Sequence, residues 1–334
     1  MRRRTWLQAA AGTLAIGGLA AHLARRRRLI RQVSPPLRTP LLYLPMTVRS
    51  DLMLRVGRPV VVRVRRPEPG IEVQAVRVPG LPRRPEVPAF TYAPAERGSG
   101  ALIWLHGGGR IAGAPQSAHR LCSLMAKRAG VLVVNVDYRL APEHPFPAAL
   151  DDCAAVLSWL REQSDTLAID PARIAVGGAS AGGGLAAELA QRALDEGFPP
   201  AFQLLLYPML DDRVRHDRGS RLGWTPGANA FAWSRYLGHP AGADEARPYA
   251  VAARREDLSG LPPAWITVGS LDLYLDECAA YARRLEEAGV ACELVVVPGM
   301  YHGADLITDG RPEPADRLWR TAAAAVRAAI GPHE

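Results

Sequence analysis

The chain has 334 residues, of which 48% are hydrophobic and 22% charged, a composition typical of a globular protein large enough for an α/β domain. Residues 1–40 contain nine arginines and no acidic residue, so residues 41–334 sum to −1 although the whole chain carries +8. We therefore predict no nucleic-acid partner, because a binding groove would need basic residues in the body of the protein. The four cysteines are too scattered for a disulfide framework or a zinc site, and we expect no metal and no cofactor.

Residues 1–34 form a basic and apolar leader. The twenty residues from Thr5 to Ala24 carry no formal charge and lie between two arginine clusters, a length that just reaches that of a bilayer-spanning helix. An uncleaved anchor, an export signal of the twin-arginine type and an interfacial helix on acidic lipid all fit this pattern. We expect residues 1–34 to contact membrane lipid in a membrane-associated or exported protein. The alternative is a cytoplasmic protein with a disordered basic extension.

Apolar runs and helical patterns alternate through the rest of the chain. The runs predict strands at 71–80, 87–94, 101–106, 131–138, 173–178, 202–208, 264–270 and 292–299. Helical patterns cover 116–129, 148–163, 181–196, 276–288 and 313–330. This order predicts an α/β fold with a doubly wound, mostly parallel sheet and helices on both faces.

The segment 211–263 interrupts this alternation. It is an insertion between two predicted strands that contains several aromatic residues, namely Trp224, Phe231, Trp233 and Tyr236. Ligands bind at the carboxyl ends of the strands in such folds, so we predict that the insertion forms a lid there. The alternative is a packing subdomain that does not contact the ligand.

The most informative motif is G-x-S-x-G, which runs from Gly178 to Gly182 around Ser180. A strand pattern precedes it, and a helical pattern beginning at Ala181 follows it. On such a turn the serine adopts a strained backbone, its hydroxyl leaves the sheet, and small neighbours let the helix pass close to the strand. We predict that Ser180 is a nucleophile and that the N–H of Ala181, at the positive end of a helix, faces a developing oxyanion.

A second motif, HGGG, comprises His106, Gly107, Gly108 and Gly109 and directly follows a predicted strand. Glycines leave backbone N–H groups unshielded, which suits the binding of a tetrahedral oxyanion. The alternative is a flexible turn that begins with histidine. Neither glycine-rich turn has the pattern of a phosphate-binding loop.

A nucleophilic serine needs a base, and the base needs an acid that orients it. Of eight histidines, only His302 directly follows the last predicted strand. Asp272 follows the preceding strand in the same way, whereas Asp276 and Glu277 are better placed to begin the next helix. The order Ser180, Asp272, His302 is that of α/β-hydrolases.

Six stretches together carry a resemblance to a known family. They are HGGG at 106–109, YRLAPEHPFPAALDD at 138–152, GASAGG at 178–183, YPMLDD at 207–212, GSLDLYLDE at 269–277 and YHG at 301–303. With these motifs the chain resembles the hormone-sensitive-lipase-like family of α/β-hydrolases, whose bacterial members are carboxylesterases. The family usually has Asp or Thr where this chain has Ala179, which leaves the subfamily open.

The resemblance implies a role for each matching residue. It makes Ser180 the nucleophile with Asp272 and His302 as partners, and it places the oxyanion donors on Gly107, Gly108, Gly109 and Ala181. Within that set Gly108, Gly109 and Ala181 are the expected donors, while Gly107 and His106 shape the loop and Gly178 and Gly182 support the turn. It also implies a helical lid from residues 35–70 and 211–263, within a hydrolase domain that spans 35–334.

We therefore expect a cofactor-independent serine hydrolase that cleaves small carboxylic esters through an acyl-enzyme. The aromatic insertion suggests an apolar acyl group, while chain length and oligomeric state stay open. Two other functions share these residues or this fold. They are amide hydrolysis and the binding of a small molecule without turnover.

Overall fold

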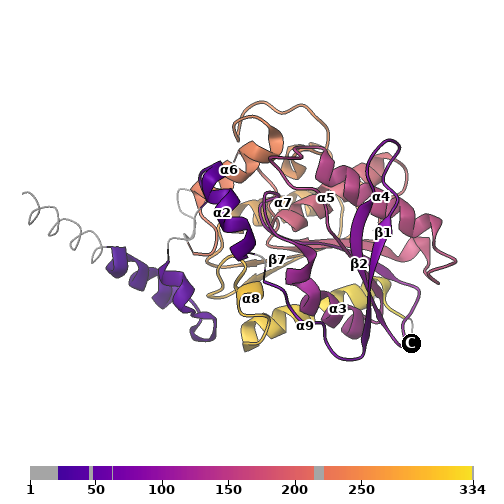
Figure 1. The fold of residues 1–334 in the computed structure, drawn as a ribbon, viewed down its shortest axis with the longest axis horizontal. Coiled ribbons are helices and arrows are strands. Elements are labelled where there is room, and N and C mark those ends of the chain that lie inside the picture. The colour runs from indigo at the N-terminus through magenta and orange to yellow at the C-terminus, as the bar shows by residue number, and fades with distance from the viewer. Residues whose placement is uncertain (1–21, 45–47, 62, 214–221, 333–334) are drawn as a thin grey trace, which may run out of the picture.

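The computed structural model describes residues 22–44, 48–61, 63–213 and 222–332. Its centre is an eight-stranded sheet in the order β1-β2-β4-β3-β5-β6-β7-β8 (Figure 1). The strands are β1 (Ile71–Val78), β2 (Val87–Pro94), β3 (Ala101–Leu105), β4 (Leu132–Val136), β5 (Ile174–Ala179), β6 (Phe202–Leu206), β7 (Ala264–Gly269) and β8 (Cys292–Val297). Strand β2 is antiparallel to both of its neighbours, and all other pairs are parallel. The predicted mostly parallel sheet is confirmed.

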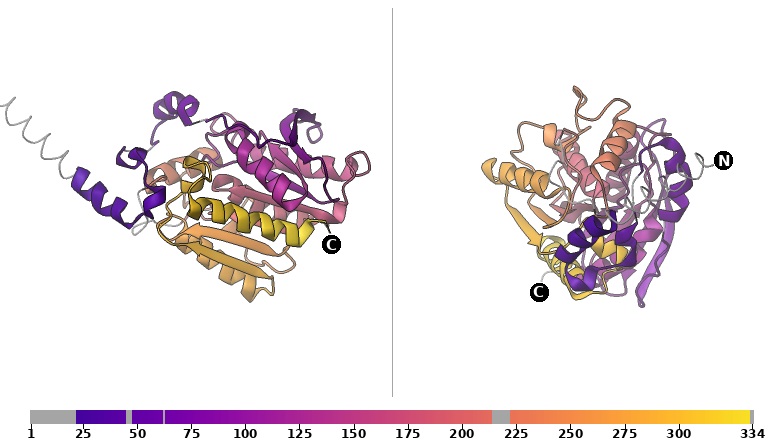
Figure 2. Two further views of the ribbon diagram at one scale, coloured as in Figure 1. Left: turned by 90° about the horizontal axis from the view of Figure 1, so that it is seen from below. Right: turned by 90° about the vertical axis from the view of Figure 1, so that its left-hand side faces the viewer.

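Helices cover both faces of this sheet. Helices α3 (His119–Ala129) and α9 (Glu313–Ile330) pack together on one face, and α4 (Ala148–Glu162), α5 (Ala181–Asp195) and α7 (Leu275–Glu287) lie on the other (Figures 1 and 2). Every residue of β3 to β7 is buried, whereas the edge strands β1 and β8 are partly exposed. Strands covered on both faces favour apolar side chains on both sides, which explains the nearly continuous apolar runs of the inner strands.

Shorter elements connect this framework. They are α8 (Ala304–Ile307) and the 3₁₀ helices η1 (Pro35–Leu37), η2 (Pro40–Tyr43), η3 (Pro115–Ala118), η4 (Pro171–Arg173) and η5 (Ala252–Arg254). Because the parallel strands all point the same way, the loops after β3, β5, β7 and β8 meet at one edge of the sheet. That edge receives the residues that the motifs single out.

The N-terminal part of the described chain packs against the rest of the protein. Residues 22–32 are helical, Ile30 and Val33 are buried in the main core, and the N–H of Ser34 donates to the carbonyl of Gly299 at 2.9 Å. In the part of the chain that the structure describes, we find no helix that is long and apolar enough to cross a bilayer. Residues 1–21, which carry most of the predicted membrane contact, lie outside the described residues.

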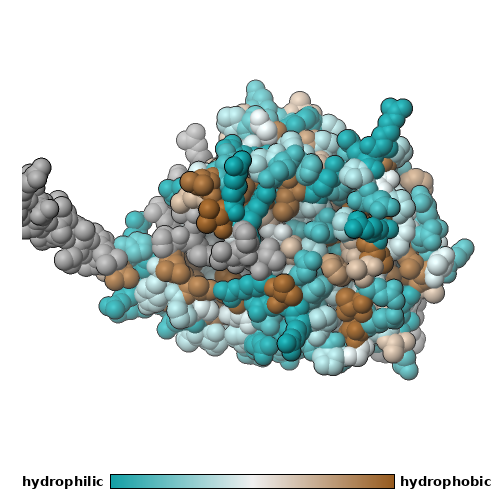
Figure 3. Space-filling model, viewed as in Figure 1, coloured by the Kyte–Doolittle hydropathy of each residue, from teal (hydrophilic) through white to brown (hydrophobic). Residues whose placement is uncertain are grey.

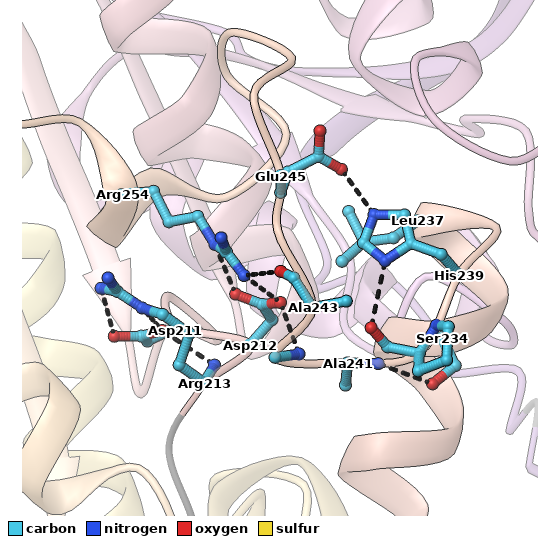
Figure 4. A network of polar contacts seen from close by, with 12 residues as sticks. Asp211, Asp212, Arg213, Ser234, Leu237, His239, Ala241, Ala243, Glu245 and Arg254 are labelled. Carbon is cyan, nitrogen blue, oxygen red and sulfur yellow. Dashed lines mark hydrogen bonds and ion pairs between the residues drawn. The ribbon is translucent and has the colours of Figure 1, made fainter.

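The insertion after β6 contains helix α6 (Pro226–Leu237) and is held in place by charged contacts. Asp212 forms an ion pair with Arg254 at 2.8 Å and accepts the N–H of Gly242. Figure 4 shows these contacts beside a second pair, in which the ring of His239 contacts Glu245 at 2.9 Å. The ion pair between Asp212 and Arg254 thereby joins the segment before α6 to the segment after it.

Helix α6 lies beside helix α2 (Asp51–Val61) at the edge where the parallel strands end (Figure 1). Arg235 of α6 and Asp51 of α2 form an ion pair at 2.8 Å. The two segments expected to build a lid, 35–70 and 211–263, are therefore in contact through these helices.

Candidate active site

Ser180 occupies the turn between β5 and α5. Its backbone has φ 57° and ψ −119°, a conformation that residues other than glycine rarely adopt and that marks a strained turn. The turn is possible because its neighbours are glycines: a Cβ on Gly182 would lie 2.0 Å from the carbonyl oxygen of Leu105. The sequence thus places the serine hydroxyl at the end of the sheet, directly before the N-terminus of a helix.

Ser180, His302 and Asp272 form one continuous chain of hydrogen bonds. The Nε2 of His302 lies 2.8 Å from the Oγ of Ser180, and its Nδ1 lies 2.9 Å from Oδ2 of Asp272. All three residues are buried. The tautomer that satisfies both contacts donates from Nδ1 to the carboxylate and accepts the serine proton at Nε2. The structure therefore brings together the three residues that the sequence selects.

Asp272 is fixed in its own loop by a further contact. One of its carboxylate oxygens accepts the N–H of Tyr274 at 2.9 Å, so the carboxylate is oriented before it meets the histidine. Asp276 and Glu277 lie in the first turn of α7, as expected. Glu277 instead accepts the N–H of Leu210 and has a structural position.

Two tyrosines hold the ring of His302 from its sides, and the sequence did not single them out. The rings of Tyr207 and Tyr274 meet the imidazole edge to face, with centroids 5.1 and 4.9 Å away. The hydroxyl of Tyr207 donates to Asp305 at 2.7 Å, and burial raises the pKa of both tyrosines well above the usual value. They therefore remain neutral hydrogen-bond donors that restrict the imidazole. The sequence signal for Tyr207 is its place in the YPMLDD stretch, which contributes to the family resemblance but to which the sequence assigns no role.

The HGGG loop lies against the serine turn. A Cβ on Gly107 would lie 3.1 Å from the carbonyl oxygen of Ala179 and 3.4 Å from the Cβ of Ser180. Among the described residues, the N–H groups of Gly108 and Gly109 donate no hydrogen bond to the protein. Unused N–H groups beside a nucleophile are suited to an oxyanion.

His106 shapes this loop from within the core. Its Nδ1 lies 2.8 Å from the carbonyl oxygen of Gly107, and its ring stacks on Tyr138 at 4.3 Å. Burial lowers the pKa of His106 to about 4, so the ring is neutral at ordinary pH. The hydroxyl of Tyr138 donates to the carbonyl of His106 at 2.6 Å. These contacts give His106 a supporting position in the loop.

Arg110, the residue after the glycines, is a buried charge that the sequence did not single out. It forms an ion pair at 2.6 Å with Glu188 of α5, and neither side chain is exposed. Its guanidinium lies between the rings of Trp233 and Tyr236 of α6, 4.3 Å from each centroid. This side chain therefore joins the HGGG loop to helix α5 and to the insertion.

The insertion reaches the site at two further points. A Cβ on Gly223 would lie 2.3 Å from the carbonyl oxygen of His302, and one on Gly109 would lie 2.9 Å from the ring of Trp224. Trp224 is half-buried. Two of the aromatic residues of the insertion thus pack around Arg110, while Trp224 lies at the HGGG loop.

No group of three or more His, Cys, Asp or Glu side chains suited to a metal gathers in the described part of the chain. The four cysteines are free, and only Cys292 is not fully buried. The chemistry that this site offers is that of an activated serine beside free N–H groups.

Known proteins match both the sequence and this geometry. The family model of the α/β-hydrolase fold matches residues 102–306. The chain is 38% identical over 277 residues to carboxylesterase NlhH of Mycobacterium tuberculosis, across 78% of this chain and 84% of the relative. The chain belongs to the hormone-sensitive-lipase-like family of α/β-hydrolases.

Other members of the family agree with this assignment. The ethyl acetate hydrolase of Pseudomonas putida is 39% identical over 208 residues, which span 60% of this chain and 65% of that protein. The structure of a bacterial heroin esterase has a TM-score of 0.80 and 34% identity, and the match covers 90% of this chain and 99% of the esterase. The chain is a hydrolase enzyme, and the fold and family expected from the sequence are confirmed.

Proposed function

We propose that the chain is a serine carboxylic-ester hydrolase in which Ser180, His302 and Asp272 act as a catalytic triad. The observation that carries this proposal is the unbroken contact from Asp272 through His302 to Ser180, with both links between 2.8 and 3.0 Å. Relatives named as ester hydrolases on the same fold support the choice of an ester as substrate.

The first half of the reaction acylates Ser180. Its Oγ bonds to the ester carbonyl carbon while its proton moves to Nε2 of His302, and the carbonyl oxygen becomes an oxyanion. The carboxylate of Asp272 holds the imidazole and stabilises its positive charge. When the tetrahedral species collapses, the bond to the alcohol oxygen breaks, and the alcohol leaves with the proton from His302.

The second half releases the acid. His302 removes a proton from water, whose oxygen bonds to the acyl carbon, and the proton then returns to Oγ of Ser180 as the carboxylic acid departs. Gly108, Gly109 and Ala181 supply the N–H groups for the oxyanion in both halves, with the positive end of α5 behind Ala181. Each such donor typically contributes roughly 10²–10³ in rate.

We assign the lid to α2 and α6, with the chain that flanks them. Support comes from the contact of Trp224 with the HGGG loop and from the hydrogen bond between the hydroxyl of Tyr274 and Asn229 of α6, at 2.8 Å. An aromatic side chain at the oxyanion loop favours an apolar acyl group over a charged one.

Residues 1–34 are proposed to attach the enzyme to a membrane or to direct its export. The arginines of this segment and its apolar stretch support contact with acidic lipid. Co-sedimentation of the full chain with vesicles that contain phosphatidylglycerol tests the attachment. A chain that stays in the supernatant contradicts it.

A fluorophosphonate probe tests the proposed chemistry, because it phosphonylates only a serine made nucleophilic by its neighbours. We expect the full chain to gain one probe, located on the peptide of Ser180 by mass spectrometry. The Ser180→Ala chain should gain none, while the matched Ser270→Ala chain should react like the wild type. A folded wild-type chain that does not react would favour a binding protein without turnover.

A further inference from the structure

Helix α2 contacts the rest of the protein through Leu54, which is buried in the core, and through polar side chains beside it. Arg58 donates to Glu143 at 2.8 Å and to the backbone carbonyls of Ile111 and Ala141. Asp51 is paired with Arg235 of α6. These contacts fix the rotation of the helix, with Leu54 and Arg58 against the body.

Three other apolar side chains of α2 face solvent as a consequence. Leu52, Met53 and Val56 lie on one side of the helix by their spacing, and their exposed fractions are 73%, 49% and 68%. Figure 3 shows hydrophobic surface gathered at α2. We call these three residues the α2 apolar face.

Most of the large exposed apolar side chains lie in one stretch of the sequence, and three of them share one side of α2. Eight large hydrophobic side chains are exposed within the described residues, and six of them lie between positions 43 and 64. The three outside α2 are Tyr43, Leu44 and Val64. Scattered exposed apolar residues are ordinary on a protein surface, whereas a concentrated group indicates a contact surface.

The positive charge of the segment that contains α2 indicates an acidic partner. Residues 22–66 contain twelve arginines and one acidic residue, whereas residues 67–334 carry a net charge of −6. An exposed apolar helix face among arginines is the pattern of a helix that lies in the surface of an acidic bilayer. The helical residues 22–32, which continue the leader, lie at the same end of the molecule as α2 (Figures 1 and 2).

We propose that the α2 apolar face inserts into the boundary between headgroups and acyl chains of an acidic membrane. This second contact deepens the membrane attachment proposed for residues 1–34 and rests on it. With this contact the lid lies on the membrane surface. Ester substrates that dissolve poorly in water then reach the enzyme from the lipid phase. Insertion of an apolar helix face adds hydrophobic burial to the electrostatic attraction of the arginines.

An environment-sensitive fluorophore on α2 tests this inference in the full chain. The half-buried Cys292 is first changed to Ser, and an NBD group is attached to Leu52→Cys. The matched control carries NBD at Phe198→Cys, because Phe198 is also exposed, at 58%, but follows the far end of α5. Circular dichroism and hydrolysis of p-nitrophenyl butyrate establish that each labelled chain is folded and active.

We expect vesicles of phosphatidylcholine and phosphatidylglycerol to cause a severalfold rise and a blue shift of NBD emission at position 52, with no change at position 198. Pure phosphatidylcholine should give a much smaller response. If the chain sediments with acidic vesicles while the label at 52 does not respond, the α2 contact is wrong and the attachment through residues 1–34 stands. If the chain does not sediment, both contacts are wrong, whereas the hydrolase proposal is untouched.

Two other occupants of the α2 apolar face give different results without vesicles. A second copy of the chain would shift the emission at position 52 as protein concentration rises. The acyl chain of a soluble substrate would shift it on addition of an ester analogue. The proposal is wrong if the emission at position 52 shifts with protein concentration or with the ester analogue and does not change on addition of acidic vesicles.

Discussion

Replacement of His302 by alanine is expected to lower kcat by about 10⁶-fold, because Ser180 then has no base within reach of its hydroxyl. Asp272→Asn should lower kcat by about 10⁴-fold, since the amide favours the wrong tautomer of the imidazole while its shape is retained. Steady-state hydrolysis of p-nitrophenyl butyrate measures both losses. The double variant should lose little more than His302→Ala alone, because residues that act as one unit are not additive.

A matched control separates this effect from a general loss of charge. Asp276 is exposed and lies in the first turn of α7, four residues beyond Asp272. We expect Asp276→Asn to keep the kcat of the wild type. If Asp276→Asn lost as much activity as Asp272→Asn, or if Asp272→Asn were fully active, the role proposed for Asp272 would be wrong.

Replacement of Arg110 by methionine is expected to lower the free energy of unfolding by about 3–5 kcal/mol, because it leaves Glu188 buried without its partner. The double change Arg110→Met and Glu188→Met should recover most of that loss, since two apolar side chains can fill the same space. Urea unfolding of the three proteins measures the difference. The exposed pair Arg283 and Glu287 of α7 supplies the control. Arg283→Met should change the stability by less than about 1 kcal/mol.

The pair Arg110 and Glu188 also predicts how the stability of the Arg110→Met protein depends on pH. Burial raises the pKa of Glu188 to about 8 in the native protein, and the guanidinium of Arg110 opposes this rise. Without Arg110 the pKa rises further, so native Glu188 binds a proton that the unfolded chain releases above about pH 4.5. Wild-type Glu188 keeps the same proton up to about pH 8, so the stabilities of the two proteins depend on pH differently only above that value. Relative to wild type, the stability of Arg110→Met should therefore fall as the pH rises above about 8. A difference in stability between variant and wild type that stays the same below and above about pH 8 would contradict this explanation.

The fold and the three residues of the proposed triad could be predicted because their signals are local. Continuous apolar runs identify strands buried on both faces, and a serine between small residues identifies the turn into α5. Asp272 and His302 could be placed because each directly follows a strand, and parallel strands end at one edge. The short motifs carried most of this information.

The surroundings of the site could not be predicted, because they depend on contacts between distant parts of the chain. Arg110 and Glu188 are 78 positions apart, and an arginine after three glycines gives no sign that it will be buried. Tyr207 contacts Asp305 across 98 positions. The orientation of α2 was also hidden, since an amphipathic pattern predicts a helix but does not say which side meets the body. In α2 the buried Leu54 and two ion pairs decide that orientation.

In the proposed mechanism Ser180 carries the acyl group during turnover, and the mass of the protein during the first turnover tests this step. Wild type and Ser180→Ala are mixed with p-nitrophenyl butyrate and quenched in acid within the first turnover, and the intact mass of each protein is determined. We predict that the wild type gains the mass of one butyryl group, on the peptide that contains Ser180, as p-nitrophenol is released in a burst. Ser180→Ala should show neither acylation nor burst. Near wild-type turnover by Ser180→Ala, or a butyryl group on a different residue, would contradict the mechanism.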